Sequence, residues 1–141
     1  SFAGRSVNVG AVWDIDGPLD ASVVLVVLCG DAEPSCRTAA VDAVFSRDPL
    51  AIHLFGVGAA QAFDALIDRQ AAARGRSPHV MTGVSDTTDL EEAIGDFLGS
   101  TFPSEERFDE WTTYEIMVAG DENDVFEVLR AVKEVLEDRP R

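Results

Sequence analysis

Basic residues are scarce in this sequence. Its 141 residues include 11 lysines and arginines against 26 aspartates and glutamates, a formal net charge of −15, and Lys133 is the sole lysine. Residues 86–141 hold 17 of the 26 acidic residues. A negative field of this size repels nucleic acid and anionic membranes, so we expect neither as a partner. The same field speeds encounter with a basic protein, although plain solubility also explains an acidic surface.

Cysteines are also few, and long apolar stretches are lacking. The two cysteines, Cys29 and Cys36, lack the spacing of a zinc site, and nothing else in the sequence suggests a disulfide. No stretch is long enough for a membrane helix and none resembles a secretory leader, so we expect a cytoplasmic protein. With 46% hydrophobic residues the chain can fill one core, which predicts a single domain over residues 1–141.

A continuous apolar run is present at residues 21–30, Ala-Ser-Val-Val-Leu-Val-Val-Leu-Cys-Gly. The run is rich in β-branched residues and shows no alternation of apolar and polar positions. This pattern is typical of a strand covered on both faces, as at the centre of a parallel sheet.

Apolar periodicity predicts alternating strands and helices along the rest of the chain. We expect strands at residues 7–13, 21–30, 50–57, 77–84 and 112–119, and helices at about 34–46, 59–74, 88–99 and 123–137. A capping box of Thr88 and Glu91 opens the third helix. Repeated strand–helix units predict a three-layer α/β/α sandwich with a mostly parallel sheet, flavodoxin-like or Rossmann-like in outline. The first strand is expected at an edge, joined by turn-forming residues 14–18 to the apolar run and antiparallel to it.

Ligands bind beyond the carboxyl ends of the strands in such a sheet. Three of these ends are acidic here, whereas a phosphate site requires positive charge and backbone N–H groups. Gly56-Val57-Gly58 lacks the third glycine of the dinucleotide fingerprint and is expected only to let a helix turn close to the sheet. His53 and His79 have no nucleophile at a telling spacing and are expected to be structural. We therefore expect no cofactor.

Two aspartate-rich segments resemble motifs of a known family. Asp14-Ile15-Asp16-Gly17 follows an apolar strand and is similar to Asp-x-Asp-Gly-Thr, the first motif of the haloacid dehalogenase-like phosphatases. Gly120-Asp121-Glu122-Asn123-Asp124 is similar to the last, metal-binding motif of that family.

This resemblance implies a Mg²⁺-dependent phosphatase. Asp14 would be its nucleophile and Asp16 its general acid, with Asp14, Asp121 and Asp124 around the metal. Pro18 stands in place of the first motif's threonine, and no lysine stands where the third motif requires one. The alternative is a simple turn at residues 14–18 and a capped helix start at 121–124.

Residues 101–111 read Thr-Phe-Pro-Ser-Glu-Glu-Arg-Phe-Asp-Glu-Trp, with three large aromatics among charged residues. Aromatic anchors ringed by charge are typical of a protein-binding surface. We predict that a partner contacts Phe102, Glu105, Glu106, Phe108, Asp109, Glu110 and Trp111, with the acidic start of the last helix as a secondary contact. The alternative is a short helical turn, capped by Ser104, that packs its aromatics on the sheet edge.

Together these patterns favour a small acidic, non-catalytic binding protein that masks a basic protein partner, as antitoxin-like and immunity-like proteins do. The Mg²⁺-dependent phosphatase is the alternative. The positions of Asp14 and Asp121 discriminate between the two, because the enzyme requires their carboxylates at one edge of the sheet.

Overall fold

The computed structural model of the chain describes residues 3–14, 17–29, 34–72 and 80–138. Within these residues five strands form one sheet in the order β1-β5-β2-β3-β4, and every neighbouring pair is parallel. The strands are β1 (Ser6–Ala11), β2 (Ser22–Leu28), β3 (Ala51–Gly56), β4 (Met81–Val84) and β5 (Thr113–Ala119). The helices in the same part of the chain are α1 (Pro34–Phe45), α2 (Ala59–Ala72), α3 (Leu90–Ser100), α4 (Glu122–Asp138) and the short 3₁₀ helices η1 (Val12–Asp14) and η2 (Glu105–Glu110).

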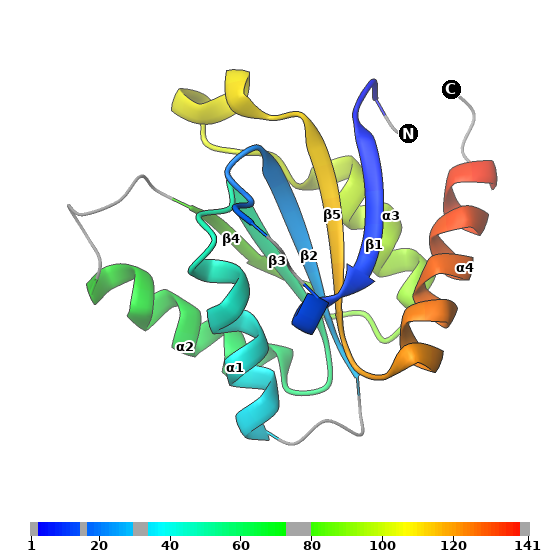
Figure 1. The fold of residues 1–141 in the computed structure, drawn as a ribbon, viewed down its shortest axis with the longest axis horizontal. Helices are drawn as coiled ribbons and strands as arrows, with labels where there is room; N and C mark the ends of the chain where they lie inside the picture. Colours follow the sequence, from blue (N-terminus) through cyan, green and yellow to red (C-terminus); the bar gives the residue numbers. More distant parts are fainter. Residues whose placement is uncertain (1–2, 15–16, 30–33, 73–79, 139–141) are drawn as a thin grey trace.

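Helices cover both faces of the sheet, which confirms the predicted three-layer sandwich. Helices α1 and α2 pack together on one face, and α3 and α4 pack together on the other (Figure 1). Strand β2 lies at the centre and all seven of its residues are buried. Its side chains alternate between the two cores, with Val24 facing α1 and Leu25 facing α3. The unbroken apolar run therefore predicted a strand covered on both faces correctly.

The first strand lies at a sheet edge as predicted, but its predicted antiparallel pairing with the apolar run is wrong. Strand β1 is parallel to β5, from Ser6 opposite Thr113 to Ala11 opposite Val118, and β5 separates it from β2. Strand β5 is buried, so its backbone N–H and C=O groups need hydrogen-bonding partners on both of its sides. Since β2 also pairs with β3, β1 takes the second side of β5. The turn-forming residues after β1 predicted a bend correctly, but they do not indicate which strand lies beside β1 in the sheet.

The start of α3 also differs from its prediction. Asp89, and not Thr88, is the N-cap: its Oδ1 accepts hydrogen bonds from the backbone N–H groups of Glu91 and Glu92 at 3.0 and 3.4 Å. The predicted capping box is therefore one residue out of register, because a carboxylate accepts two N–H groups and interacts favourably with the positive helix end. Residues 77–79 of the predicted fourth strand, including His79, lie outside the described residues.

Because all strand pairs are parallel, the sheet has an amino edge, where its strands begin, and a carboxyl edge, where they end. Helix η2 crosses the amino edge on the way from α3 to β5, and α4 begins at the carboxyl edge directly after β5. Figure 1 shows η2 in yellow beyond one end of the strands and the start of α4 in orange beyond the other. None of the helices among the described residues is both long and apolar enough to cross a membrane.

Candidate functional site

Two buried side chains hold η2 against the amino edge. Arg107 is only 8% exposed; its Nη1 donates to the carbonyl oxygen of Pro49 at 3.5 Å, and its Nε lies 3.7 Å from a carboxylate oxygen of Glu110. Trp111 is 9% exposed and donates from Nε1 to the carbonyl oxygen of Thr113 at 3.1 Å. The segment is thus fastened both to the start of β3 and to the start of β5.

Aromatic rings and the Arg5 side chain connect the same segment to the N-terminal end of β1. The guanidinium of Arg5 lies 3.8 Å from the centroid of the Trp111 ring and 5.7 Å from that of Phe108. Phe108 and Tyr114 each meet Trp111 edge-on, with ring centroids 5.5 and 5.2 Å apart. Edge-on aromatic pairs and cation–π contacts are favourable in this geometry, so they fix the orientation in which η2 meets the solvent.

The outer side of η2 combines exposed phenyl rings with carboxylates. Phe102 is 53% exposed and Phe108 is 44% exposed. Glu105, Glu106 and Asp109 are exposed, and within the described residues no hydrogen bond or ion pair involves their carboxylates. We call this set the η2 surface: Phe102, Glu105, Glu106, Phe108, Asp109 and Glu110.

Trp111, the seventh residue predicted for partner contact, lies beneath the η2 surface and supports Phe108. Ser104 occupies the N-cap position of η2, but its side chain makes no capping hydrogen bond. The segment therefore combines both predicted alternatives: a helical turn that packs one aromatic inward and leaves two aromatics outside. The sequence pattern marked the segment but did not distinguish the inward ring from the outward ones.

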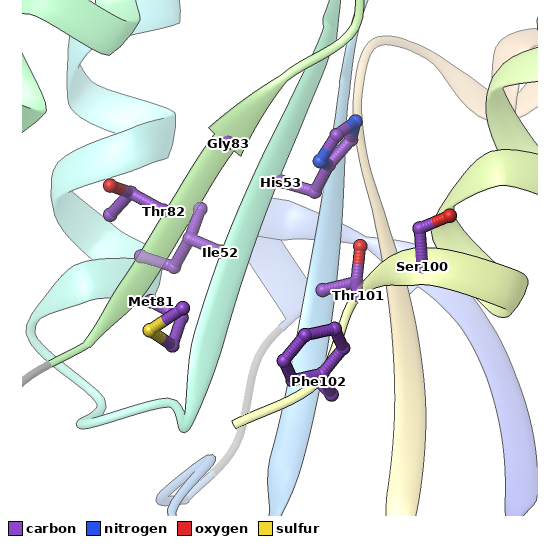
Figure 2. A pocket seen from close by; sticks show the side chains of 8 residues that line it. All are labelled: Ile52, His53, Met81, Thr82, Gly83, Ser100, Thr101 and Phe102. Carbon is purple, nitrogen blue, oxygen red and sulfur yellow. The ribbon is translucent and has the colours of Figure 1, made fainter. Parts of the chain in front are cut away.

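A pocket beside Phe102 was not predicted from the sequence. It has a volume of about 130 Å³ and lies between β3, β4 and the end of α3. Figure 2 shows Phe102 at one side and the Thr101 hydroxyl pointing toward the imidazole of His53. The lining residues are Ile52, His53, Met81, Thr82, Gly83, Ser100, Thr101 and Phe102. Because they come from three separate segments, the single local cue was a histidine within an otherwise apolar strand.

His53 is the titratable residue among those that line the pocket. Its ring lies against Gly83, where an added Cβ would come within 2.9 Å of Nδ1, and its buried Nε2 has no hydrogen-bond partner in the described part of the chain. Burial lowers the pKa of His53 below its usual 6.5, and the nearby negative charge of Asp96 opposes this change only in part. The imidazole is therefore neutral at pH 7, so one of its nitrogens is a hydrogen-bond acceptor.

The aspartates at the carboxyl edge interact with backbone groups. Asp121 accepts a hydrogen bond at Oδ1 from the N–H of Asp124, and Asp124 accepts one at Oδ2 from the N–H of Asp121, both at 3.0 Å. Since Ala11 pairs with Val118, the exposed Asp14 follows β1 to the same edge at which Asp121 follows β5. Asp16 lies outside the described residues, and among those that are described no three His, Cys, Asp or Glu side chains are grouped to hold a metal ion.

Glycine geometry shapes the rest of the carboxyl edge. Gly56 has a φ of +118°, and a Cβ there would lie 2.0 Å from the carbonyl oxygen of Leu28. A residue with a side chain would therefore not fit at this turn from β3 into α2. Gly58, with a φ of +77°, lies against the side chain of Arg37, whose buried Nε has no hydrogen-bond partner among the described residues and lies beside a second pocket of about 350 Å³.

Comparisons with protein-family models, with curated protein sequences and with solved structures found no match to this chain. The site must therefore be interpreted from its own chemistry. Its two distinguishing features are the carboxylates of the η2 surface and the pocket that adjoins them.

Proposed function

We propose that this chain is a small acidic binding protein whose η2 surface covers a basic surface of a partner protein, as antitoxin-like and immunity-like proteins do. One observation carries the proposal: the carboxylates of Glu105, Glu106 and Asp109 interact with nothing in the described part of the chain, while the backbone that bears them is held rigidly. Carboxylates that contribute nothing to their own fold are free to meet lysine and arginine side chains. We place this encounter in the cytoplasm.

Charge and apolar area have different tasks at such an interface. Carboxylates at its rim attract a basic partner over distance, which raises the association rate and makes that rate depend on salt. Phe102 and Phe108 supply apolar area that becomes buried in the complex and slows dissociation. Because Trp111 and Arg5 already hold Phe108, little conformational entropy is lost when that ring is buried.

The test begins with a pull-down from the native host and continues with kinetics on the purified basic protein that it captures. Changing Glu105 and Glu106 to glutamine and Asp109 to asparagine should slow association about tenfold or more at low salt and weaken its salt dependence. Phe108→Ala should chiefly speed dissociation, by about tenfold or more.

A matched control separates local charge from net charge. The control variant removes the same number of negative charges, three, from exposed positions on α2 and α4, by the changes Asp64→Asn, Asp68→Asn and Glu127→Gln. This control should slow association by less than about threefold, because distant charges are screened. If the control and the η2 variant slow association equally, net charge alone acts and the proposed surface is wrong.

A Mg²⁺-dependent phosphatase resembling the haloacid dehalogenase-like family is the second candidate. It is supported by the parallel pairing of β1 with β5, which brings Asp14 and Asp121 to one edge. The hydrogen bonds of Asp121 and Asp124 to backbone groups count against it. Hydrolysis of p-nitrophenyl phosphate with Mg²⁺, assayed with the unchanged chain and with Asp14→Asn, decides between the two candidates. We expect no hydrolysis that depends on Asp14. A hydrolytic activity of the unchanged chain that is lost in Asp14→Asn would favour the enzyme.

A further inference from the structure

The pocket beside Phe102 is the size of one ring. Its volume is about 130 Å³, and a cavity of about 150 Å³ in another protein holds one benzene molecule. Pockets for free small molecules are larger, about 300–1,000 Å³. The size therefore fits one side chain of a partner better than a metabolite or a nucleotide.

The walls of the pocket favour an aromatic ring. Phe102 lines it with more than half of its surface still open to solvent, and the thioether of Met81 lies nearby. The imidazole of His53 forms a further wall and is backed by the Phe97 ring, 6.5 Å away between centroids. Ring–ring and sulfur–ring contacts are favourable beyond the area that they bury.

Two polar groups face this apolar space, the His53 imidazole and the Thr101 hydroxyl (Figure 2). Within the described residues no hydrogen bond involves either group's side-chain polar atoms. A plain phenyl ring would leave both groups without a partner, and an ammonium group would lose its hydration against the apolar walls. A phenol fits both requirements, because its O–H donates one hydrogen bond and accepts another.

We infer that this pocket receives one tyrosine side chain of the partner, with its ring between Phe102 and His53 and its hydroxyl bonded to the Thr101 hydroxyl. The inference rests on the proposed protein-binding function and adds the partner's anchor to it. The pocket shares Phe102 with the η2 surface, so the anchored ring and the partner's cations would lie in one continuous interface.

The experiment uses N-acetyl-L-tyrosinamide as the probe and follows the chain by NMR. The expected result is saturable shifts confined to His53, residues 81–83 and residues 100–102. N-acetyl-L-phenylalaninamide should bind about fivefold more weakly, the effect of one lost hydrogen bond. N-acetyl-L-lysinamide should not shift these residues. No saturable shift with the tyrosine probe, or equal affinity for the tyrosine and phenylalanine probes, would overturn the inference.

Two variants and a control sharpen the result. Thr101→Val preserves shape and removes the hydroxyl, so the preference for the tyrosine probe should fall to less than about twofold. Gly83→Ala forces the imidazole to move and should abolish binding. Thr88→Val is the control, since Thr88 is exposed and does not line the pocket, and it should change nothing. A preference that survives Thr101→Val contradicts the inference even if Gly83→Ala does not fold.

The partner kinetics separate this inference from the proposed function. If the η2 charge variant binds the partner unchanged while the tyrosine probe still fills the pocket, the proposed function fails and the pocket stands. If partner binding depends on the η2 carboxylates but Thr101→Val dissociates no faster than the unchanged chain, the inference alone is wrong.

Discussion

Acidic side chains have opposite roles at the two edges of the sheet. At the carboxyl edge, the carboxylates of Asp89, Asp121 and Asp124 accept hydrogen bonds from backbone N–H groups at the starts of α3 and α4. At the amino edge, Glu105 and Asp109 stand on a short 3₁₀ helix, and no described residue bonds to their carboxylates. An acid therefore stabilises the fold where its carboxylate accepts backbone N–H groups at a helix start, and it stays available to another molecule where it accepts none.

The two edges also differ in what shapes their backbone. The carboxyl edge depends on glycine conformations, above all that of Gly56. The amino edge depends on buried side chains, because Arg107 and Trp111 hold a segment that has little regular structure of its own. Substitutions at the carboxyl edge should thus affect stability, and substitutions of outward residues at the amino edge should affect binding only.

Gly56→Ala should have the largest effect. The new Cβ would overlap the Leu28 carbonyl oxygen, and the φ of +118° is one that residues with side chains rarely adopt. We expect a loss of about 3–5 kcal/mol in the free energy of unfolding, measured by urea denaturation. Gly10→Ala is the control, because a Cβ there would meet nothing within 4 Å. Equal losses for the two variants would contradict the assigned role of Gly56.

Asp124→Ala should be destabilising, whereas Asp109→Ala should not. The first change removes the acceptor for the N–H of Asp121 and should cost about 1 kcal/mol, as the loss of a helix cap does. The second change removes an exposed carboxylate that bonds to no described residue, and its effect on the free energy of unfolding should lie within about 0.5 kcal/mol of zero. Thermal unfolding of the two variants at pH 7 tests the contrast between the edges directly.

Glu115 lies on β5 between the two edges, and its pKa is raised above the usual 4.5 because burial disfavours the charged form. The hydrogen bond from Asn8, at 3.2 Å, offsets this in part. The folded state thus holds this proton to higher pH than the unfolded state, so stability falls as pH rises from 4.5 through the folded pKa. Glu115→Gln should raise the Tm by about 2 °C at pH 7 and by nothing near pH 3. A lower Tm at pH 7 would contradict this account.

The smallest effect concerns His53. Its lowered pKa means that stability is complete above pH 6.5 and declines as the pH falls from 6.5 to the folded value, because the unfolded state gains a proton first. Asp96→Asn removes the charge that raises this pKa, so an NMR titration should give a still lower value. Asp68→Asn, on the opposite face, should leave the pKa unchanged. A higher value in Asp96→Asn would show that another group controls the imidazole.

Local patterns predicted the elements of this fold but not the partners of each strand. The apolar run of β2 was sufficient to place it at the centre, because only a strand covered on both faces can be apolar throughout. The apolar pattern of β1 did not predict its position in the sheet in the same way. Asn8 of β1 bonds to Glu115, 107 residues away in the chain, and the turn-forming residues between β1 and β2 do not indicate that β1 pairs with β5.

The site was predictable to a similar degree. Interleaved aromatic and acidic residues marked the η2 segment, yet the inward turn of Trp111 depends on Arg5, 106 residues away, which stacks on its ring. The pocket escaped prediction because each contributing segment looks ordinary by itself. Thr101 follows a helix and Gly83 is one glycine of a short strand. Only the folded structure shows that both line one pocket with His53.

The parallel pairing of β1 with β5 has a consequence for biosynthesis. Strands β2, β3 and β4 can pair in the order in which they are made, but among the described strands β1 pairs with β5 alone. As ribosomes add about 5–20 residues per second, the first strand waits several seconds for residues 113–119 to emerge. Until then one side of β2 also lies open, because Ser22 pairs with Thr113, 91 residues later. The nascent chain thus exposes an unpaired strand edge until β5 pairs between β1 and β2, and a chaperone that shields β2 in that interval should raise the yield of folded protein.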